Sequence, residues 1–222
     1  MAMVGGDFDF AVLHRYTGMR KSDRDLRKPL KCKKVVVQLK HFLQSKLHRA
    51  VPIVVTEYNV SGKSGKRLSP IALSLTLGEM IGNYLESGAM ISNYWPMRFK
   101  DPRAMFSLNK GEPRAPYYVF KALSNYTYDR LLKTRSDDEM LYALSSKESK
   151  SGEITLFLIN KSSKVMNANI ELPGNYKPIE SLEIDREDLT LHLLKQYKEK
   201  TLSSKWELSL DPLSLTVVRF GL

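Results

Sequence analysis

In the first part of the chain, short apolar runs alternate with longer stretches of helical periodicity. The run Val51 to Val60 contains consecutive β-branched residues and carries Glu57 near its end, which is typical of a buried parallel strand with a carboxylate at its C-terminal end. The run Asp7 to Tyr16 has the same form and brings His14 to a strand end. A third run, Ala89 to Trp95, ends in an aromatic residue. We therefore predict three strands that all present polar or aromatic side chains at one edge.

Helical spacing of apolar residues separates these runs. It predicts helices over Leu30 to Leu47, Pro70 to Ser87 and about Tyr117 to Leu131, and Pro70 and Gly88 supply a start and a stop for the second helix. The glycine-containing basic stretch Ser61 to Ser69 is predicted to be a mobile loop above the strand that bears Glu57. A strand–helix–strand order of this kind favours a parallel sheet with right-handed crossovers.

The pattern changes at about Ser136. Short runs with partial alternation follow, separated by Gly, Pro, Asn and Ser, and they predict an antiparallel β-sandwich. The runs are Met140 to Leu144, Glu153 to Asn160, Val165 to Leu172, Ile179 to Ile184 and Leu215 to Phe220. The polar stretch Asp185 to Leu210 is interpreted as a long hairpin or an insertion, without a definite placement. We expect an α/β segment over residues 1–134 and an all-β domain over residues 135–222.

Composition fits a globular protein with no membrane span. The chain has 222 residues, of which 42% are hydrophobic, and no apolar run approaches the roughly 20 residues that a membrane helix needs. The N-terminal residues do not resemble a signal peptide, so the expected chain is soluble and either cytoplasmic or secreted as part of a longer precursor. Cys32 is the single cysteine, which excludes an internal disulfide. We predict no metal site and no cofactor.

The net charge of +11 raises the question of a nucleic-acid partner. Between Met19 and Arg49 there are eleven Lys or Arg residues against two Asp residues, a local balance of 11 − 2 = +9. Such a stripe can contact phosphates. No helix-turn-helix, zinc-finger or aromatic RNA-binding signature accompanies it. We interpret it as a solvated helix face and keep nucleic-acid binding that weakens with added salt as the alternative.

Taken together, the order of these motifs resembles the C-terminal part of a clan A glycoside hydrolase. The motifs are the His-x-Tyr strand, the basic helix, Thr56-Glu57-Tyr58-Asn59, a second helix, Asn93-Tyr94-Trp95 and Pro116 to Phe120. Family 51 α-L-arabinofuranosidases are the most similar, with family 39 β-xylosidase-like enzymes second. The runs Ile154 to Ser162 and Leu210 to Phe220 resemble strands of the β domain in those enzymes. The resemblance implies about strands 6–8 of a (β/α)8 TIM barrel, followed by the β-sandwich.

The same resemblance implies a reaction and a set of roles. Glu57 takes the position of the nucleophile of a retaining glycosidase, which attacks the anomeric carbon of the sugar. His14 and Tyr16, at the end of the neighbouring strand, are suited to hydrogen-bond Glu57 or sugar hydroxyls, and Asn59 and Trp95 complete the expected substrate contacts. The alternatives are a solvated acidic turn for Glu57, polar side chains satisfied at a strand end for His14 and Tyr16, and a core aromatic for Trp95.

One part of the family pattern is missing. Clan A enzymes carry their acid/base glutamate after an asparagine at the end of strand 4, and no Asn-Glu pair occurs in this chain. We therefore expect a C-terminal fragment of a glycosidase for plant-type polysaccharides or oligosaccharides. It would be inactive alone and partnered by the missing barrel half or another subunit. A non-catalytic carbohydrate-binding or structural protein, in which the β-sandwich does the binding, is the alternative.

Overall fold

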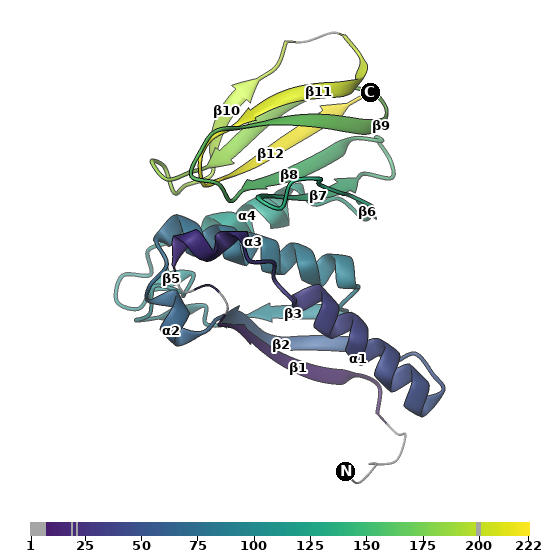
Figure 1. Ribbon diagram of the computed structural model, residues 1–222, viewed down its shortest axis with the longest axis vertical. Coiled ribbons are helices and arrows are strands. Elements are labelled where there is room, and N and C mark those ends of the chain that lie inside the picture. The colour runs from purple at the N-terminus through teal and green to yellow at the C-terminus, as the bar shows by residue number, and fades with distance from the viewer. Residues whose placement is uncertain (1–7, 19, 21, 199–200) are drawn as a thin grey trace.

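The computed structural model describes residues 8–18, 20, 22–198 and 201–222, and in its first part it contains a three-stranded parallel sheet (Figure 1). The sheet has the order β1-β2-β3, and its strands and their two main connecting helices are β1 (Ala11–Thr17), α1 (Cys32–Leu47), β2 (Ile53–Val60), α3 (Pro70–Ser87) and β3 (Ile91–Tyr94). All five lie close to the predicted ranges, although Asp7 and the residues before it fall outside the described part. The helices pack on one side of the sheet, where Ile53 and Val55 are fully buried.

Helix α3 begins and ends where its capping residues predict. The Ser69 hydroxyl oxygen accepts a hydrogen bond from the Ala72 amide at 3.3 Å, Pro70 occupies the first turn, and Gly88 adopts the left-handed conformation with φ 63°. Lys40 of α1 donates from Nζ to the carbonyl oxygens of Ser87 and Gly88, at 2.8 and 2.6 Å. One lysine of the basic segment therefore binds the negative end of the α3 dipole.

Two connections differ from the expectation. The loop predicted over Ser61 to Ser69 contains a short helix, α2 (Gly62–Gly65). The helix predicted to reach Leu131 is α4 (Ala115–Tyr126), because the residues after it leave the helix to join the C-terminal sheet as β6 (Arg130–Leu132). A small parallel pair, β4 (Arg98–Phe99) and β5 (Phe106–Ser107), lies in the loop before α4.

The C-terminal part is antiparallel. Its strands are β7 (Leu141–Lys147), β8 (Ile154–Asn160), β9 (Met166–Ile184), β10 (His192–Gln196), β11 (Ser203–Leu210) and β12 (Ser214–Gly221). They form the sheet order β10-β9-β12-β8-β7-β6, and β11 pairs with β9 outside this order. The unassigned stretch from Asp185 to Leu210 supplies β10 and β11. Strand β6 belongs to this C-terminal sheet although it lies before residue 134. The domain boundary between residues 134 and 135 stays a prediction.

Strand β9 corrects the expectation of two separate strands over Val165 to Leu172 and Ile179 to Ile184. It is one strand of 19 residues that changes partner along its length. Its first part pairs with β11 and its last part with β12 and β10. Pro173 and Gly174 lie at the crossing point, where a missing amide donor and a flexible backbone are tolerated. The two resulting layers enclose a core that includes Leu156, Ile170 and Phe220.

The helices α3 and α4 lie between the parallel sheet and the β-sandwich (Figure 1). One continuous apolar cluster contains Val55 of β2, Leu77 of α3, Val119 of α4 and Val217 of β12. Helix α3 is buried along almost its whole length for this reason. No described helix is both long enough and apolar enough to cross a membrane.

The opposite face of the parallel sheet is uncovered, and no barrel closes. Val12 pairs with Val54, and Val54 pairs with Ile91, so these three side chains form one row on the face away from the helices. Val12 and Ile91 are 53% and 45% exposed. Within the described residues β1 and β3 each have a single strand neighbour. The structure is thus consistent with a partial glycosidase fold.

A buried charge cluster ties these layers together. Arg20 is fully buried and its Nη2 lies 2.5 Å from Glu79 Oε2 in the middle of α3, while Lys161 Nζ, from the turn after β8, lies 3.8 Å from the same oxygen. Arg20 also donates to the carbonyl oxygens of Leu26 and Lys28. Burial lowers the pKa of Lys161, and the Glu79 carboxylate opposes that shift. Glu79 is therefore a structural residue.

Replacing Glu79 by Ala is expected to destabilise the protein by about 3–5 kcal/mol, because it leaves two buried cations without their counter-charge. Urea unfolding followed by circular dichroism measures this change. Glu112→Ala, at a glutamate whose side chain is 65% exposed, is the control and should change stability far less. A loss below about 1 kcal/mol for Glu79→Ala would show that the cluster does not hold the layers together.

Candidate active site

A β-bulge directs Glu57 toward the uncovered face of the sheet. Leu13 pairs with Val55, but the next residue, His14, pairs with Glu57, so β2 carries one extra residue at this point. Side chains alternate between the faces of a strand, and neighbouring paired residues share a face. Without the bulge, Thr56 would lie beside His14. With it, Glu57 lies on the same face as His14 and Tyr16.

Tyr16 is the direct hydrogen-bond partner of Glu57. Its phenol donates to Glu57 Oε2 at 2.7 Å. Burial, followed by the hydrogen bond and the negative charge of Glu57, raises the pKa of Tyr16 to about 12. The phenol therefore remains protonated at neutral pH and keeps a donor on the carboxylate.

His14 lies on the other side of the same oxygen. His14 Nδ1 is 3.7 Å from Glu57 Oε2, and the two side chains are 55% and 36% exposed. The distance fits a weak or water-bridged contact. Both described partners of Glu57 approach Oε2. The geometry gives one partly exposed carboxylate with a hydrogen-bond donor at that oxygen.

Trp95 forms an aromatic wall beside this carboxylate. It is 40% exposed, its ring centroid lies 6.4 Å from that of Tyr16 at 78°, and the Phe99 ring lies 5.9 Å away on another side. The peptide bond between Trp95 and Pro96 is cis. An exposed ring held by aromatic neighbours offers an apolar plate for the face of a sugar.

Asn59 does not share this exposed position. It is 1% exposed, and its Nδ2 donates to the carbonyl oxygen of Trp95 at 2.6 Å. The side chain thus holds the backbone at the end of β3 and has no surface for a ligand. Of the predicted substrate contacts, the structure brings His14, Tyr16 and Trp95 together around Glu57, and it places Asn59 beneath them.

Arg103 supports the site and was not singled out from the sequence. Its guanidinium is paired with Asp101 at 2.8 Å and donates to the carbonyl oxygen of Val60, the last residue of β2, at 2.8 Å. The side chain packs over Gly65, where an added Cβ would collide with it. The Tyr94 phenol donates to the Arg103 carbonyl oxygen. The spacing of these residues along the chain does not predict the contacts, because they join the loop after β4 to the ends of β2 and β3 and to α2.

The comparisons with known proteins agree with this architecture. A xyloglucanase of glycoside hydrolase family 44 from Paenibacillus polymyxa has a TM-score of 0.76 and 13% identity, over 96% of this chain and 47% of that one. An α-L-arabinofuranosidase from Thermotoga maritima has a TM-score of 0.74 and 13% identity, over 96% and 53%. A family 30 xylanase from Clostridium acetobutylicum has a TM-score of 0.63 and 14% identity, over 96% and 49%.

These similarities show the fold: the chain is built like the C-terminal part of clan A glycoside hydrolases. The chain spans about half the length of the structures it matches. No family model matches the sequence, and no curated protein does either. Because structures of families 44 and 30 match in addition to an arabinofuranosidase, the resemblance to family 51 in particular stays a prediction.

Replacing Glu57 by Gln should lower the pKa of Tyr16 from about 12 while keeping it above its ordinary value of 10.0, because burial is the largest cause of the shift and remains. Nuclear magnetic resonance of 13Cζ-labelled tyrosine, assigned with Tyr16→Phe, measures this pKa. An unchanged pKa in Glu57→Gln would contradict the hydrogen bond.

The raised pKa of Tyr16 also makes the stability of the folded chain depend on pH. Since the pKa is higher in the folded state, the contribution of Tyr16 to stability is complete below pH 10 and is lost as the pH rises toward 12.

Proposed function

We propose that this chain supplies the nucleophile side of a retaining glycoside hydrolase active site, with Glu57 as the nucleophile. The observation that carries the proposal is the bulge-directed Glu57 carboxylate, held at Oε2 by Tyr16 on the uncovered face of a parallel sheet. In barrel enzymes, catalytic residues come from the C-terminal ends of several strands. Glu57 and His14 each lie three residues before the end of their strand, and Trp95 directly follows β3.

In this reaction Glu57 Oε1 attacks the anomeric carbon, the bond to the leaving oxygen breaks, and water later hydrolyses the glycosyl-enzyme ester. The Tyr16 hydrogen bond orients the Glu57 carboxylate. His14, mostly exposed beside the carboxylate, is placed to contact a sugar hydroxyl, and Trp95 to stack on the ring. Asn59 and Arg103 act as positioning residues. No metal or cofactor takes part in this proposal.

The proton donor is proposed to lie outside these 222 residues, on the missing barrel half or on a separate subunit. The exposed side chains of Val12 and Ile91 support this. Among the described residues, the outer strands β1 and β3 each have one free edge, and exposed apolar side chains beside free edges favour a covering partner. The chain covers only about half the length of the solved glycosidases that it matches, which also supports a missing part of the site. Retaining enzymes place their two carboxyl groups about 5–5.5 Å apart, so the partner has to approach Glu57 closely.

The proposed substrates are plant-type oligosaccharides or polysaccharides. The solved structures that match are described as a xyloglucanase, an arabinofuranosidase and a xylanase. The motif resemblance to family 51 makes α-L-arabinofuranosides the first compounds to test. Partial exposure of Trp95 agrees with a site that accommodates a sugar ring.

The β-sandwich offers less support for the alternative of a non-catalytic sugar-binding protein. It contains a cavity of about 880 Å³, lined by apolar side chains such as Leu156 and Ile170 and by polar side chains such as Arg135 and Asn169. No aromatic residue is among the described lining residues. A sugar site would be expected to offer an aromatic plate, and Trp95 supplies one elsewhere.

A chain with a nucleophile and no acid should react with substrates whose leaving group needs no protonation. Dinitrophenyl α-L-arabinofuranoside or β-D-xyloside should release dinitrophenol slowly from the chain, whereas methyl glycosides should be inert without the partner. Adding the polypeptide encoded immediately upstream should make methyl glycosides substrates. Stopped-flow absorbance and mass spectrometry of a glycosyl adduct on the Glu57 peptide measure these steps.

Glu57→Gln should abolish both reactions and Glu112→Gln, at an exposed glutamate, should leave them unchanged. Circular dichroism confirms that each variant is folded. Full activity of Glu57→Gln, or turnover of methyl glycosides by the chain alone, would exclude the assigned nucleophile or the division of the site between two polypeptides.

A further inference from the structure

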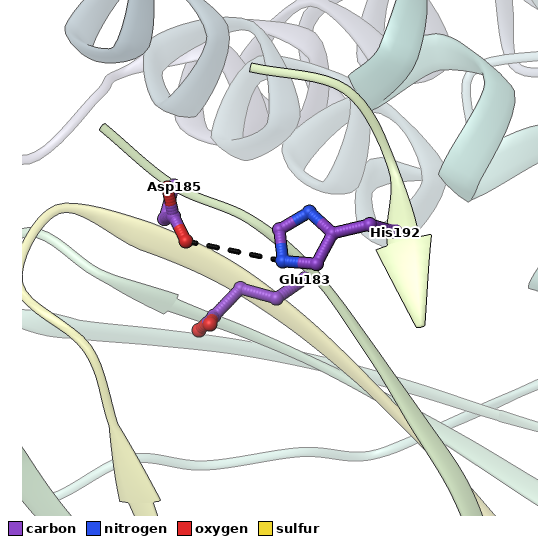
Figure 2. A group of neighbouring side chains, drawn as sticks. All are labelled: Glu183, Asp185 and His192. Carbon is purple, nitrogen blue, oxygen red and sulfur yellow. Dashed lines mark ion pairs between the residues drawn. The ribbon is translucent and has the colours of Figure 1, made fainter. Parts of the chain in front are cut away.

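Three side chains with metal-binding atoms meet at the hairpin between β9 and β10, far along the chain from Glu57. Glu183 lies near the end of β9, Asp185 follows that strand, and His192 is the first residue of β10. One ligand atom from each lies within 4.8 Å of the others. Figure 2 shows the two carboxylates and the imidazole around a common space, with the Asp185 to His192 ion pair dashed.

Glu183 is a buried carboxylate whose second oxygen is unsatisfied. The residue is 1% exposed, and its Oε1 accepts a hydrogen bond from the Thr216 hydroxyl at 2.9 Å. Among the described residues, its Oε2 has no hydrogen-bond partner. The neighbouring Ser214 hydroxyl donates to the carbonyl oxygen of Asp211 at 2.8 Å. A buried carboxylate oxygen without a hydrogen-bond partner is unfavourable, and a bound cation would satisfy it.

Asp185 is oriented by the turn that follows it. Its Oδ1 accepts from the amides of Glu187 and Asp188, at 2.6 and 2.7 Å. Its Oδ2 lies 4.0 Å from His192 Nε2. Because the first oxygen is used by the turn, the second is available to the common space. Its described ion pairs include no lysine or arginine.

His192 directs its Nε2 atom toward the space between the two carboxylates (Figure 2). Its Nδ1 lies 3.2 Å from the carbonyl oxygen of Thr190 and 3.5 Å from Asp188 Oδ2. Asp188 is itself held by the amide and hydroxyl of Thr190. A proton on Nδ1 that is donated to these oxygens leaves the lone pair of Nε2 free. Metal-binding histidines are oriented by this kind of contact.

We propose that Glu183 Oε2, Asp185 Oδ2 and His192 Nε2 form a binding site for one zinc-like divalent cation. Imidazole and carboxylate together suit zinc, whereas calcium takes oxygen ligands. Ligand atoms about 2.1 Å from a tetrahedral zinc lie about 3.4 Å apart, so binding requires the three groups to move together by up to about 1 Å. Asp185 and His192 are partly exposed and can make that movement. Water completes the coordination.

The position of the site indicates a structural role. Ile184, Leu189 and Leu191, which flank the ligands, contact the apolar core shared with α3. A cation there would join β9 to β10 and fix the hairpin against the helical layer. Metal bound only to the folded state raises stability by mass action. Because the site is remote from Glu57, this inference does not depend on the proposed glycosidase function.

The test is titration of the full chain, first freed of metal with a chelator, with zinc in competition against a chromophoric chelator. We expect one zinc ion per chain, a rise in unfolding temperature with zinc, and no saturable binding of calcium. His192→Ala should weaken zinc binding by at least about tenfold, and Glu183→Gln should do the same while preserving side-chain size. Circular dichroism without metal confirms the fold of each variant.

His14→Ala is the matched control, because His14 also lies beside a carboxylate, at 3.7 Å from Glu57. It should leave zinc binding unchanged. Loss of binding in His14→Ala but not in His192→Ala would move the ion to Glu57 and overturn the proposal. So would wild-type affinity in both His192→Ala and Glu183→Gln, or the absence of saturable zinc binding by the wild-type chain.

Discussion

The ion pair between Arg20 and Glu79 is the contact on which the arrangement of the layers depends. Glu79 is in the middle of α3, between the parallel sheet and the β-sandwich, and Arg20 follows β1 by three residues. Arg20 also binds the carbonyl oxygens of Leu26 and Lys28, while Lys161 reaches Glu79 from the sandwich. Three parts of the chain thus meet at one buried carboxylate. The anchored segment after β1 keeps the end of that strand, with its site residues, in register with β2.

The sequence was sufficient to predict the strand that carries Glu57, but not the face on which Glu57 lies. A buried apolar run identifies a strand by composition, and strict alternation would then place Thr56 beside His14. The bulge between the pairs Leu13–Val55 and His14–Glu57 reverses that alternation. A bulge forms where one strand of a pair has one more residue than the other between two matched positions. It therefore depends on both strands and cannot be predicted from either one alone. The burial of Asn59 could not be predicted for a similar reason. Its side chain donates to the carbonyl oxygen of Trp95, which directly follows the neighbouring strand β3.

Local signals account for the best predictions, and their absence accounts for the misses. Helix α3 was predicted within its bounds because Pro70 and Gly88 are chemical start and stop signals adjacent to it. The 19-residue β9 was divided into two strands because Pro173 and Gly174 usually end a strand, and here a change of partner strand tolerates them. The group of Glu183, Asp185 and His192 was not predicted because its members lie on β9, directly after β9 and on β10, and the polar stretch between the strands has no periodicity.

The openness of the sheet determines how far water reaches Glu57. The face that exposes Val12 and Ile91 also leaves the Glu57 side chain 36% exposed, so water screens the carboxylate and its contact with Tyr16. Charges and hydrogen bonds interact more strongly where water is excluded. A partner that covers the apolar row would therefore dry the site, strengthen the Tyr16 hydrogen bond and deliver the proton donor in one association step. Assembly and catalysis would then share one interface, and a partner that bound only one free edge of the sheet would leave Glu57 in water.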